Sequence, residues 1–510
     1  MQLLWNFSMC SRIIIKVMDM LQRQTLSKMI KLAVVMIFFI TTTSFVKQDE
    51  IITISQQDLI DYINTSNIEK YDSKKIEGIK PISSEKYKNQ VRCIRDFMID
   101  NHVYYEAQNI EEIRNSYNKL LNDSQNKTVL DLNLDLMKVI SKYKQGHVTI
   151  LPIDMKKSEV FIAEFNEKYY IVEANEQFNN LLGSEVISIN NIKIKDIVDR
   201  LETYAIGENK SFRRRQQNYL LNSYGILKKE NLIAEKQNIY ELKTGDKIIK
   251  VVIPFVKSDD LIVSKLKING RKTDILQYER KRTSNENNVS IKPLSNPVDV
   301  NRLHYIETKG DKLILRYNSC TENDNYKIEK FTKDVCDKLD SNKFSNIIID
   351  LRYNSGGDSS YIFNIFSKMM AYQGANPKTK IKVLISDGTY SSAGDCALLF
   401  VKNFHNVEVI GTDSGFPVLT YGGNVNMFYT KDTYFQISYC MMVFRQHYED
   451  VDSYLFNYMN FDFDRNTMTP DFHAEQSFAD YMIGNDPAMN YALRDEGDNF
   501  LINKIKNLKR

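Results

Sequence analysis

Two adjacent serines, Ser391 and Ser392, lie in the stretch "SDGTYSSAGDCALLF", between the apolar strand pattern "KIKVLI" and a helical pattern. A serine hydroxyl at such a corner is accessible, and the next amide, at the start of a helix, faces the negative charge that develops on an attacked carbonyl. The corner therefore suits a nucleophile. The alternative is that one serine only caps the helix by accepting hydrogen bonds from its first amides.

Small residues accompany this corner. Ala393 and Gly394 follow the serines directly, and Gly356 and Gly357 end the segment "DLRYNSGG" after another strand pattern. Small side chains let a substrate approach the backbone, whose amides can bind an oxyanion. Chemistry in parallel sheets collects at the carboxyl ends of strands, so we expect both segments at one edge of a sheet.

His147 is a candidate general base. It lies in "KQGHVTILP", between a helical pattern that ends at Gly146 and a strand pattern. Imidazole can accept a proton near neutral pH, although a single histidine also serves purely structural roles. The six cysteines show no CxxC spacing and no clustering with histidine. We therefore expect no metal ion and no cofactor.

The composition is that of a globular chain of several domains. The protein has 510 residues, of which 43% are hydrophobic and 26% charged, and its formal net charge is +3. This near balance of acids and bases gives no indication of a nucleic-acid partner. The length corresponds to about three domains.

The N-terminal half changes in pattern along the chain. Residues 1–47 contain a basic flank and the apolar stretch "LAVVMIFFITTTSFV", which predicts a signal peptide or an N-terminal membrane anchor. Residues 48–150 carry amphipathic helical patterns and predict a helical domain that ends at the histidine. Residues 151–255 alternate as β-hairpins do, and residues 256–300 predict a connecting region of strand and loop.

Residues 301–510 alternate short apolar strand patterns with helical ones. This alternation predicts a mostly parallel sheet covered by helices, and thus an α/β domain in a chain that is α+β overall. The strand ends that precede the glycine pair and the two serines belong to this domain. It is therefore the expected site of chemistry.

Four segments together resemble the serine peptidase family of tail-specific, C-terminal processing and tricorn-core proteases. They are "IIIDLRYNSGG", "GTYSSAGDCALLF", "EVIGTDSG" and "TMTPDFHAEQSFADYMIGNDPAMNYAL", in this order. The resemblance implies a crotonase-like or ClpP-like sheet for residues 301–510, the peptidase core. The segment "GSEVISINNIKIKDIV" also resembles part of a PDZ domain, which implies a PDZ-like module at residues 151–255.

The resemblance assigns roles residue by residue. It implies Ser392 as the nucleophile, and the amides of Ala393, Gly356 and Gly357 as the oxyanion hole. Pro417 stands where the processing branch of the family carries a lysine base, which favours the tricorn-like branch.

In the tricorn-like branch a histidine is the base, and His147 matches its position. Asp464 matches the position of the acid that orients it, with Asp462 as a neighbouring alternative. Gly146 stands where the tricorn type has a helping serine, so we expect a triad.

The resemblance implies an exported serine endopeptidase, secreted or anchored at the cell surface, that hydrolyses extended or unfolded polypeptides. A second hypothesis is an inactive relative that binds peptides or apolar ligands with the same fold. A third is an acyl-transfer enzyme of crotonase type, although no coenzyme A-binding pattern is recognisable.

Overall fold

The computed structural model describes residues 80–100, 110–150, 152–153, 156–234, 237–257, 263–268, 289–291, 302–418, 420–430, 433, 435–445 and 467–494. All of them belong to one compact unit, Gln57–Arg510. The expected signal peptide or anchor lies outside the described residues. Within the described ranges, no helix combines the length and apolar character needed to cross a membrane.

The N-terminal part of the described chain is helical, as expected. Its elements are β1 Pro81–Ile82, α4 Ser84–Asp100, α5 Ile110–Asn122, β2 Lys127–Thr128 and α6 Val129–Ser141. A capping box starts α6, because Thr128 and Asp131 each accept a hydrogen bond from the other's backbone amide. The helix α6 ends six residues before His147 and so leads the chain to it.

A largely antiparallel sheet follows, with strand order β10-β9-β7-β6-β12-β13, β5 beside β6 and β8 beside β7. Its strands are β5 Val160–Phe165, β6 Lys168–Asn175, β7 Glu185–Ile189, β8 Ile192–Lys193, β9 Ile239–Thr244, β10 Lys247–Val252, β12 Val263–Ile268 and β13 Val289–Ile291. Strands β4 Lys156–Ser158 and β11 Phe255–Lys257 pair separately. The PDZ-like character of this region stays a prediction.

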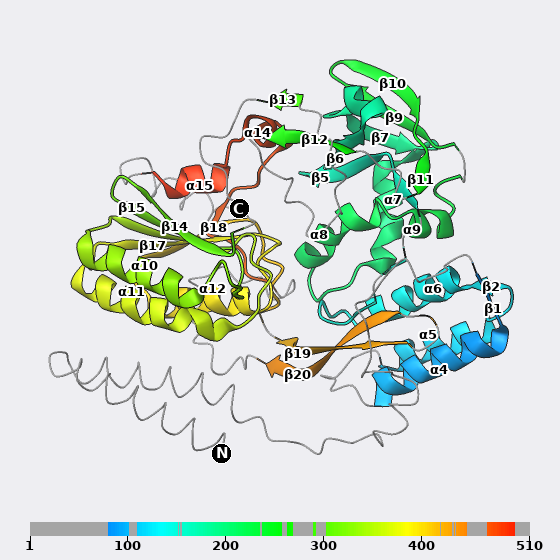
Figure 1. The fold of residues 1–510 in the computed structure, drawn as a ribbon, viewed down its shortest axis with the longest axis horizontal. Coiled ribbons are helices and arrows are strands. Elements are labelled where there is room, and N and C mark those ends of the chain that lie inside the picture. Colours follow the sequence, from blue (N-terminus) through cyan, green and yellow to red (C-terminus); the bar gives the residue numbers. More distant parts are fainter. Residues whose placement is uncertain are drawn as a thin grey trace, which may run out of the picture. The chain divides into compact units, whose positions relative to one another are not determined.

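Helices occupy the long connection between β8 and β9 (Figure 1). They are α7 Ile194–Leu201, η3 Glu202–Tyr204, α8 Lys210–Leu220 and α9 Tyr224–Lys229, and η2 Glu176–Leu181 precedes β7. Asn209 caps α8 by accepting a hydrogen bond from the amide of Phe212. Its amide group also donates to the backbone oxygen of Gly415 at 3.0 Å. This contact ties the start of α8 to the C-terminal half of the chain.

The C-terminal half contains the expected parallel sheet, with strand order β14-β15-β16-β17-β18-β21. The strands are β14 His304–Lys309, β15 Lys312–Tyr317, β16 Asn346–Asp350, β17 Lys380–Ile385, β18 Val407–Gly411 and β21 Phe472–His473. All neighbours from β15 onward pair in parallel, and only β14 is antiparallel. The mixed α/β class is confirmed, whereas the crotonase-like or ClpP-like assignment stays a prediction.

Helices connect these strands and cover the sheet (Figure 1). They are α10 Ile328–Ser341, η5 Ser359–Ile362, α11 Phe363–Ala375, α12 Ser392–Asn403, α14 Phe478–Ile483 and α15 Pro487–Ala492. Ile314, Ile348, Leu384 and Ile410 form a row across four strands, and α15 packs its apolar side chains against that row. Burial of this row explains why the strands read as continuous apolar runs.

A small third sheet joins the two halves of the chain. Strands β19 Thr420–Tyr429 and β20 Gln436–Arg445 form a hairpin, and β3 Thr149–Ile150 adds to β20. The hydroxyl of Ser438 donates to the backbone oxygen of His147 at 2.8 Å and accepts from the amide of Thr149 at 3.1 Å. The histidine is therefore held on the C-terminal half, almost 300 residues further along the chain.

Candidate active site

Ser391 occupies the corner between β17 and α12 with backbone angles φ 53° and ψ −134°. A non-glycine residue at positive φ costs about 1–3 kcal/mol, and such residues cluster at functional sites. The helix α12 begins at the next residue, so Ser391 itself stands outside it. This geometry is that of a nucleophile at a strand-to-helix elbow.

His147 lies against this serine. Its Nε2 atom is 3.2 Å from the Ser391 hydroxyl oxygen, which is hydrogen-bond distance. Burial lowers the pKa of His147 to about 4, although a hydrogen bond with the backbone of Gly422 opposes the shift. The imidazole is therefore neutral near pH 7 and can accept a proton from the serine.

Ser392, which the family motif indicates as the nucleophile, does not contact the histidine through any described hydrogen bond. Its hydroxyl donates to the backbone oxygen of Gly357 at 2.6 Å. The reason is the backbone, because Ser392 is already the first residue of α12, whereas Ser391 precedes the helix in the strained conformation. The expected pairing of His147 with Ser392 is thus replaced by a pairing with Ser391.

Two backbone amides, one in the glycine pair and one at the start of α12, are candidate oxyanion donors. The strand-like contact with Cys320 uses the oxygen of Gly356 and the amide of Asp358, so the Gly357 amide points to the other side. The amide of Ser392 begins α12 and has no partner within the helix. Among the hydrogen bonds of the described residues, none engages either amide. Gly357 and Ser392 are therefore the available oxyanion donors.

The other expected donors are occupied. The Gly356 amide donates to the side-chain oxygen of Asn354 at 2.9 Å, and the Ala393 amide to the backbone oxygen of Tyr390 at 3.2 Å. Gly356 is required for a different reason, since a Cβ atom there would lie 2.8 Å from the Cβ of Ser391. Because Gly356 has no side chain, the loop that contains Gly356 and Gly357, the glycine loop, can approach Ser391 closely.

A tyrosine and a glutamate lie behind the histidine. The hydroxyl of Tyr390 is 3.1 Å from His147 Nδ1 and 3.3 Å from both carboxylate oxygens of Glu208. The amide of Gly146 donates to the same carboxylate at 3.2 Å. A Cβ atom at Gly146 would lie 2.4 Å from the tyrosine hydroxyl, so glycine leaves the room that Tyr390 needs.

Sequence reasoning missed Glu208, because a single acid in "IGENK" belongs to none of the recognised motifs. Burial raises the pKa of Glu208 to about 7, against the hydrogen bonds from Gly146 and Tyr390 and the charge of Arg213. Such a displaced pKa beside a candidate base is typical of functional sites. The acids expected from the sequence, Asp464 and Asp462, lie outside the described residues.

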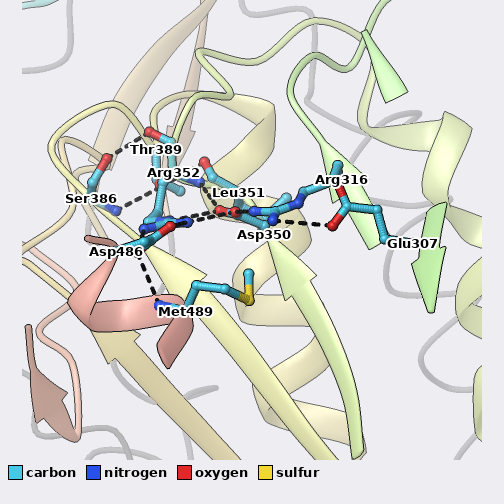
Figure 2. A network of polar contacts seen from close by, with 9 residues as sticks. All are labelled: Glu307, Arg316, Asp350, Leu351, Arg352, Ser386, Thr389, Asp486 and Met489. Carbon is cyan, nitrogen blue, oxygen red and sulfur yellow. Dashed lines mark hydrogen bonds and ion pairs between the residues drawn. The ribbon is translucent and has the colours of Figure 1, made fainter. Parts of the chain in front are cut away.

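A buried ionic network holds the glycine loop in place (Figure 2). Asp350, at the end of β16, binds the guanidinium groups of Arg316 at 2.5 Å and Arg352 at 2.8 Å, and Arg352 also binds Asp486 at 2.7 Å. Burial alone would raise the pKa of Asp350, but Arg352 and then Arg316 outweigh it and hold the pKa well below its usual range. The carboxylate is therefore ionised at all ordinary pH values.

The same network reaches residues 386–391, the serine loop, which connect β17 to α12. Ser386 donates from its hydroxyl to the backbone oxygen of Arg352 at 2.6 Å, and Thr389 to that of Leu351 at 2.9 Å (Figure 2). Two hydroxyls of the segment before Ser391 thus bind the backbone that leads to the glycine pair. The "DLR" of the motif positions both halves of the candidate oxyanion hole.

A cavity of about 340 Å³ adjoins the site, and His147, Tyr390 and Ser355 form part of its wall. Its volume accommodates a substrate side chain. In the described part of the chain, no three His, Cys, Asp or Glu side chains are close enough together to hold a metal ion.

Comparison with solved structures identifies the fold. Two structures of mature CPAF, one complexed with lactacystin, match with TM-scores of 0.52 and 0.51 and 11% identity. They cover 83% and 84% of this chain and 98% of the respective CPAF chain. The tricorn protease matches with a TM-score of 0.34 and 13% identity, over 84% of this chain and 37% of that one.

The resemblance to the tail-specific and tricorn-core peptidase family is therefore confirmed as a likeness of fold. No protein-family model matches the chain, and the search of curated proteins returned no significant match. At 11% identity the likeness concerns the backbone, and the chemistry of the site depends on the side chains of this chain.

The strain at Ser391 gives a first prediction. Ser391→Gly should raise the urea midpoint relative to Ser391→Ala, by about 1 kcal/mol of stability, because glycine adopts positive φ without a Cβ penalty. Both variants lack the hydroxyl, so they differ mainly in backbone strain. Equal midpoints for the two variants would contradict the strained conformation.

Proposed function

We propose that this protein is an exported serine endopeptidase that acts on extended or unfolded polypeptide, with Ser391 as nucleophile and His147 as general base. The observation that carries the proposal is the 3.2 Å contact between His147 Nε2 and the hydroxyl of a serine in a strained elbow. The motifs in residues 301–510 that resemble those of the tail-specific and tricorn-core peptidases support a polypeptide substrate.

Acylation begins with attack of the Ser391 oxygen on the peptide carbonyl carbon. His147 accepts the hydroxyl proton at Nε2 as the new C–O bond forms, and then delivers it to the leaving amine as the C–N bond breaks. Water, activated in the same way, hydrolyses the acyl-enzyme. The depressed pKa of His147 keeps the ring neutral before attack and makes it a ready proton donor afterwards.

The tetrahedral intermediate carries a negative oxygen, and the amides of Gly357 and Ser392 would bind it. The Ser392 amide also lies at the positive end of α12, which adds a favourable dipole. Pre-oriented donors of this kind contribute about 3–4 kcal/mol each to catalysis when removed singly. In this assignment Ser392 acts through its backbone and not through its hydroxyl.

Tyr390 and Glu208 are positioning residues in this mechanism. We assign the proton of His147 to Nδ1, which donates to the Tyr390 oxygen, while the tyrosine hydroxyl donates to Glu208. The tyrosine thereby transmits the carboxylate's charge to the imidazole, which becomes positive during attack. This role is the one that the family resemblance implies for Asp464.

The pH dependence tests that relay. We expect the rate of Ser391 acylation to rise in two steps, near pH 4 as His147 loses its proton and near pH 7 as Glu208 ionises. The second step arises because an ionised carboxylate stabilises the developing imidazolium, by about tenfold in rate. Glu208→Gln keeps one oxygen that can accept from Gly146 and Tyr390 but removes the charge, so the upper step should disappear.

Glu202→Gln is the matched control for the pH experiment. Glu202 binds Arg213 and Gln217, and no described contact joins it to His147. The variant should keep both steps of the rate profile. A profile of Glu208→Gln that still rises near pH 7 would show that the carboxylate does not act on the histidine.

The decisive experiment for the function is labelling with a fluorophosphonate probe, followed by mapping of the modified residue. The proposal expects modification at Ser391, loss of labelling in His147→Ala, and hydrolysis of casein by the wild type. A folded protein that is not labelled would be a peptide-binding relative instead. Turnover of acyl-CoA without casein hydrolysis would favour the acyl-transfer hypothesis.

A further inference from the structure

The cavity beside His147 and Tyr390 is mostly apolar. Its apolar wall is formed by Met137, Ile140, Ile150, Ile206, Phe212 and Leu220. Walls of this kind lower the local dielectric constant, which strengthens the interaction of any charge in the cavity with a ligand of opposite charge. The charge of the ligand that the cavity prefers therefore depends on the charged groups in its lining.

Among the residues described as lining the cavity, Arg215 carries a charge near pH 7, whereas the imidazole of His147 is neutral there. It lies on α8 beside two arginines that are paired. Arg213 binds Glu202 at 2.8 Å, and Arg214 binds Glu164 and Glu475, each at 2.6 Å. Among the described residues, none forms a hydrogen bond or an ion pair with Arg215.

The unpaired guanidinium reaches the serine loop. A Cβ atom built on Gly388 would lie 3.0 Å from Arg215 Nη1, and Gly388 precedes Ser391 by three residues. The same built atom would lie 2.3 Å from the backbone oxygen of Arg352, so glycine is needed at this position. A cation is therefore placed between the serine loop and a cavity that shares the candidate base.

We propose that this cavity binds a carboxylate of the polypeptide substrate and that Arg215 holds it close to the bond that is cut. The proposal rests on the peptidase function proposed above and specifies its substrate. A carboxylate matches the planar guanidinium, and the apolar walls match the methylene groups of glutamate or aspartate. A partly buried cation without a protein partner is stabilised when a substrate supplies the negative charge.

Binding can be measured independently of catalysis. We would use the Ser391→Ala protein and fluorescein-labelled ten-residue peptides with amidated C-termini, each carrying one glutamate at a varied position. Each peptide is compared by fluorescence anisotropy with its glutamine counterpart. At least one glutamate peptide should bind about tenfold or more tightly, as expected for a charge-assisted hydrogen bond in a shielded site.

A second arm distinguishes the source of the carboxylate. Peptides without acidic side chains are compared with free and with amidated C-termini. A preference for the free terminus would identify the α-carboxylate as the bound group, and a preference for internal glutamate would identify a side chain. If neither carboxylate improves binding, the proposal is overturned.

Variants of Arg215 complete the test. Arg215→Gln should abolish the carboxylate preference, and Arg215→Glu should reverse it in favour of lysine peptides. Arg213→Gln removes the same charge from a residue two positions earlier in α8 and should keep the preference. A preference that survives Arg215→Gln would refute the assignment.

Fluorophosphonate labelling of the wild type reports on the catalytic proposal separately. Normal labelling at Ser391 with equal binding of glutamate and glutamine peptides would remove only the carboxylate site. Failure of labelling would remove the peptidase proposal, while the binding measurement would still decide whether the cavity selects a carboxylate.

Discussion

Replacing Ser391 by alanine is expected to lower the rate of peptide hydrolysis by about 10⁴-fold or more, whereas Ser392→Ala should lower it by less than about tenfold. The first change removes the hydroxyl that lies 3.2 Å from His147. The second removes a hydrogen bond to the Gly357 oxygen but keeps the Ser392 amide that we assign to the oxyanion hole. Casein hydrolysis and fluorophosphonate labelling measure both rates.

The two serines are each other's control, because they are adjacent and the substitutions are identical. Circular dichroism and the urea midpoint would verify that both variants are folded. The opposite result, an inactive Ser392→Ala and an active Ser391→Ala, would restore the nucleophile that the family motif implies. It would also mean that the elbow rotates by one residue when substrate binds.

Asp350→Asn is expected to destabilise the protein by about 3–5 kcal/mol, since removing one partner of a buried ion pair leaves uncompensated charge. The Asp350 and Arg316 side chains are both fully buried, and Arg352 is nearly so. The network holds the segments that lead to Gly357 and Ser391, so activity should fall along with the urea midpoint.

Two comparisons separate charge from general damage. Asp337→Asn removes a carboxylate from an exposed pair with Lys333 and should leave the midpoint unchanged. The double variant Asp350→Leu with Arg316→Met replaces a buried pair by apolar groups and should recover part of the stability lost in Asp350→Asn. A midpoint of Asp350→Asn equal to that of the wild type would show that the network contributes little.

The parallel sheet could be predicted from the sequence because its strands are buried on both faces. Runs such as "KLILRY" and "NIIID" contain more apolar residues than an amphipathic strand could place on one side. The same rule put the glycine pair and the serine corner at one edge. The family resemblance predicted that His147 would lie at the same edge, and in the structure its Nε2 atom is within hydrogen-bond distance of the Ser391 hydroxyl.

The choice between the two serines was beyond the sequence. Moving the proposed nucleophile by one residue changes no pattern of hydrophobicity. The structure distinguishes Ser391 by its positive φ and by its contact with His147. The sequence did not indicate Glu208 as a site residue for a related reason. It meets Tyr390 and Gly146 through folding of distant segments, and neither spacing nor composition marks one glutamate among many.

The pairing of β3 with β20 has a consequence for the order of events during synthesis of the chain. His147 is seated by Ser438, so a chain still growing on the ribosome has its imidazole long before the strand that seats it. Ser391 also emerges earlier than that strand. Synthesis must therefore pass Ser438 before the His147 imidazole and the Ser391 hydroxyl can be held together, so the proposed hydrolytic activity would begin only after β20 has been made.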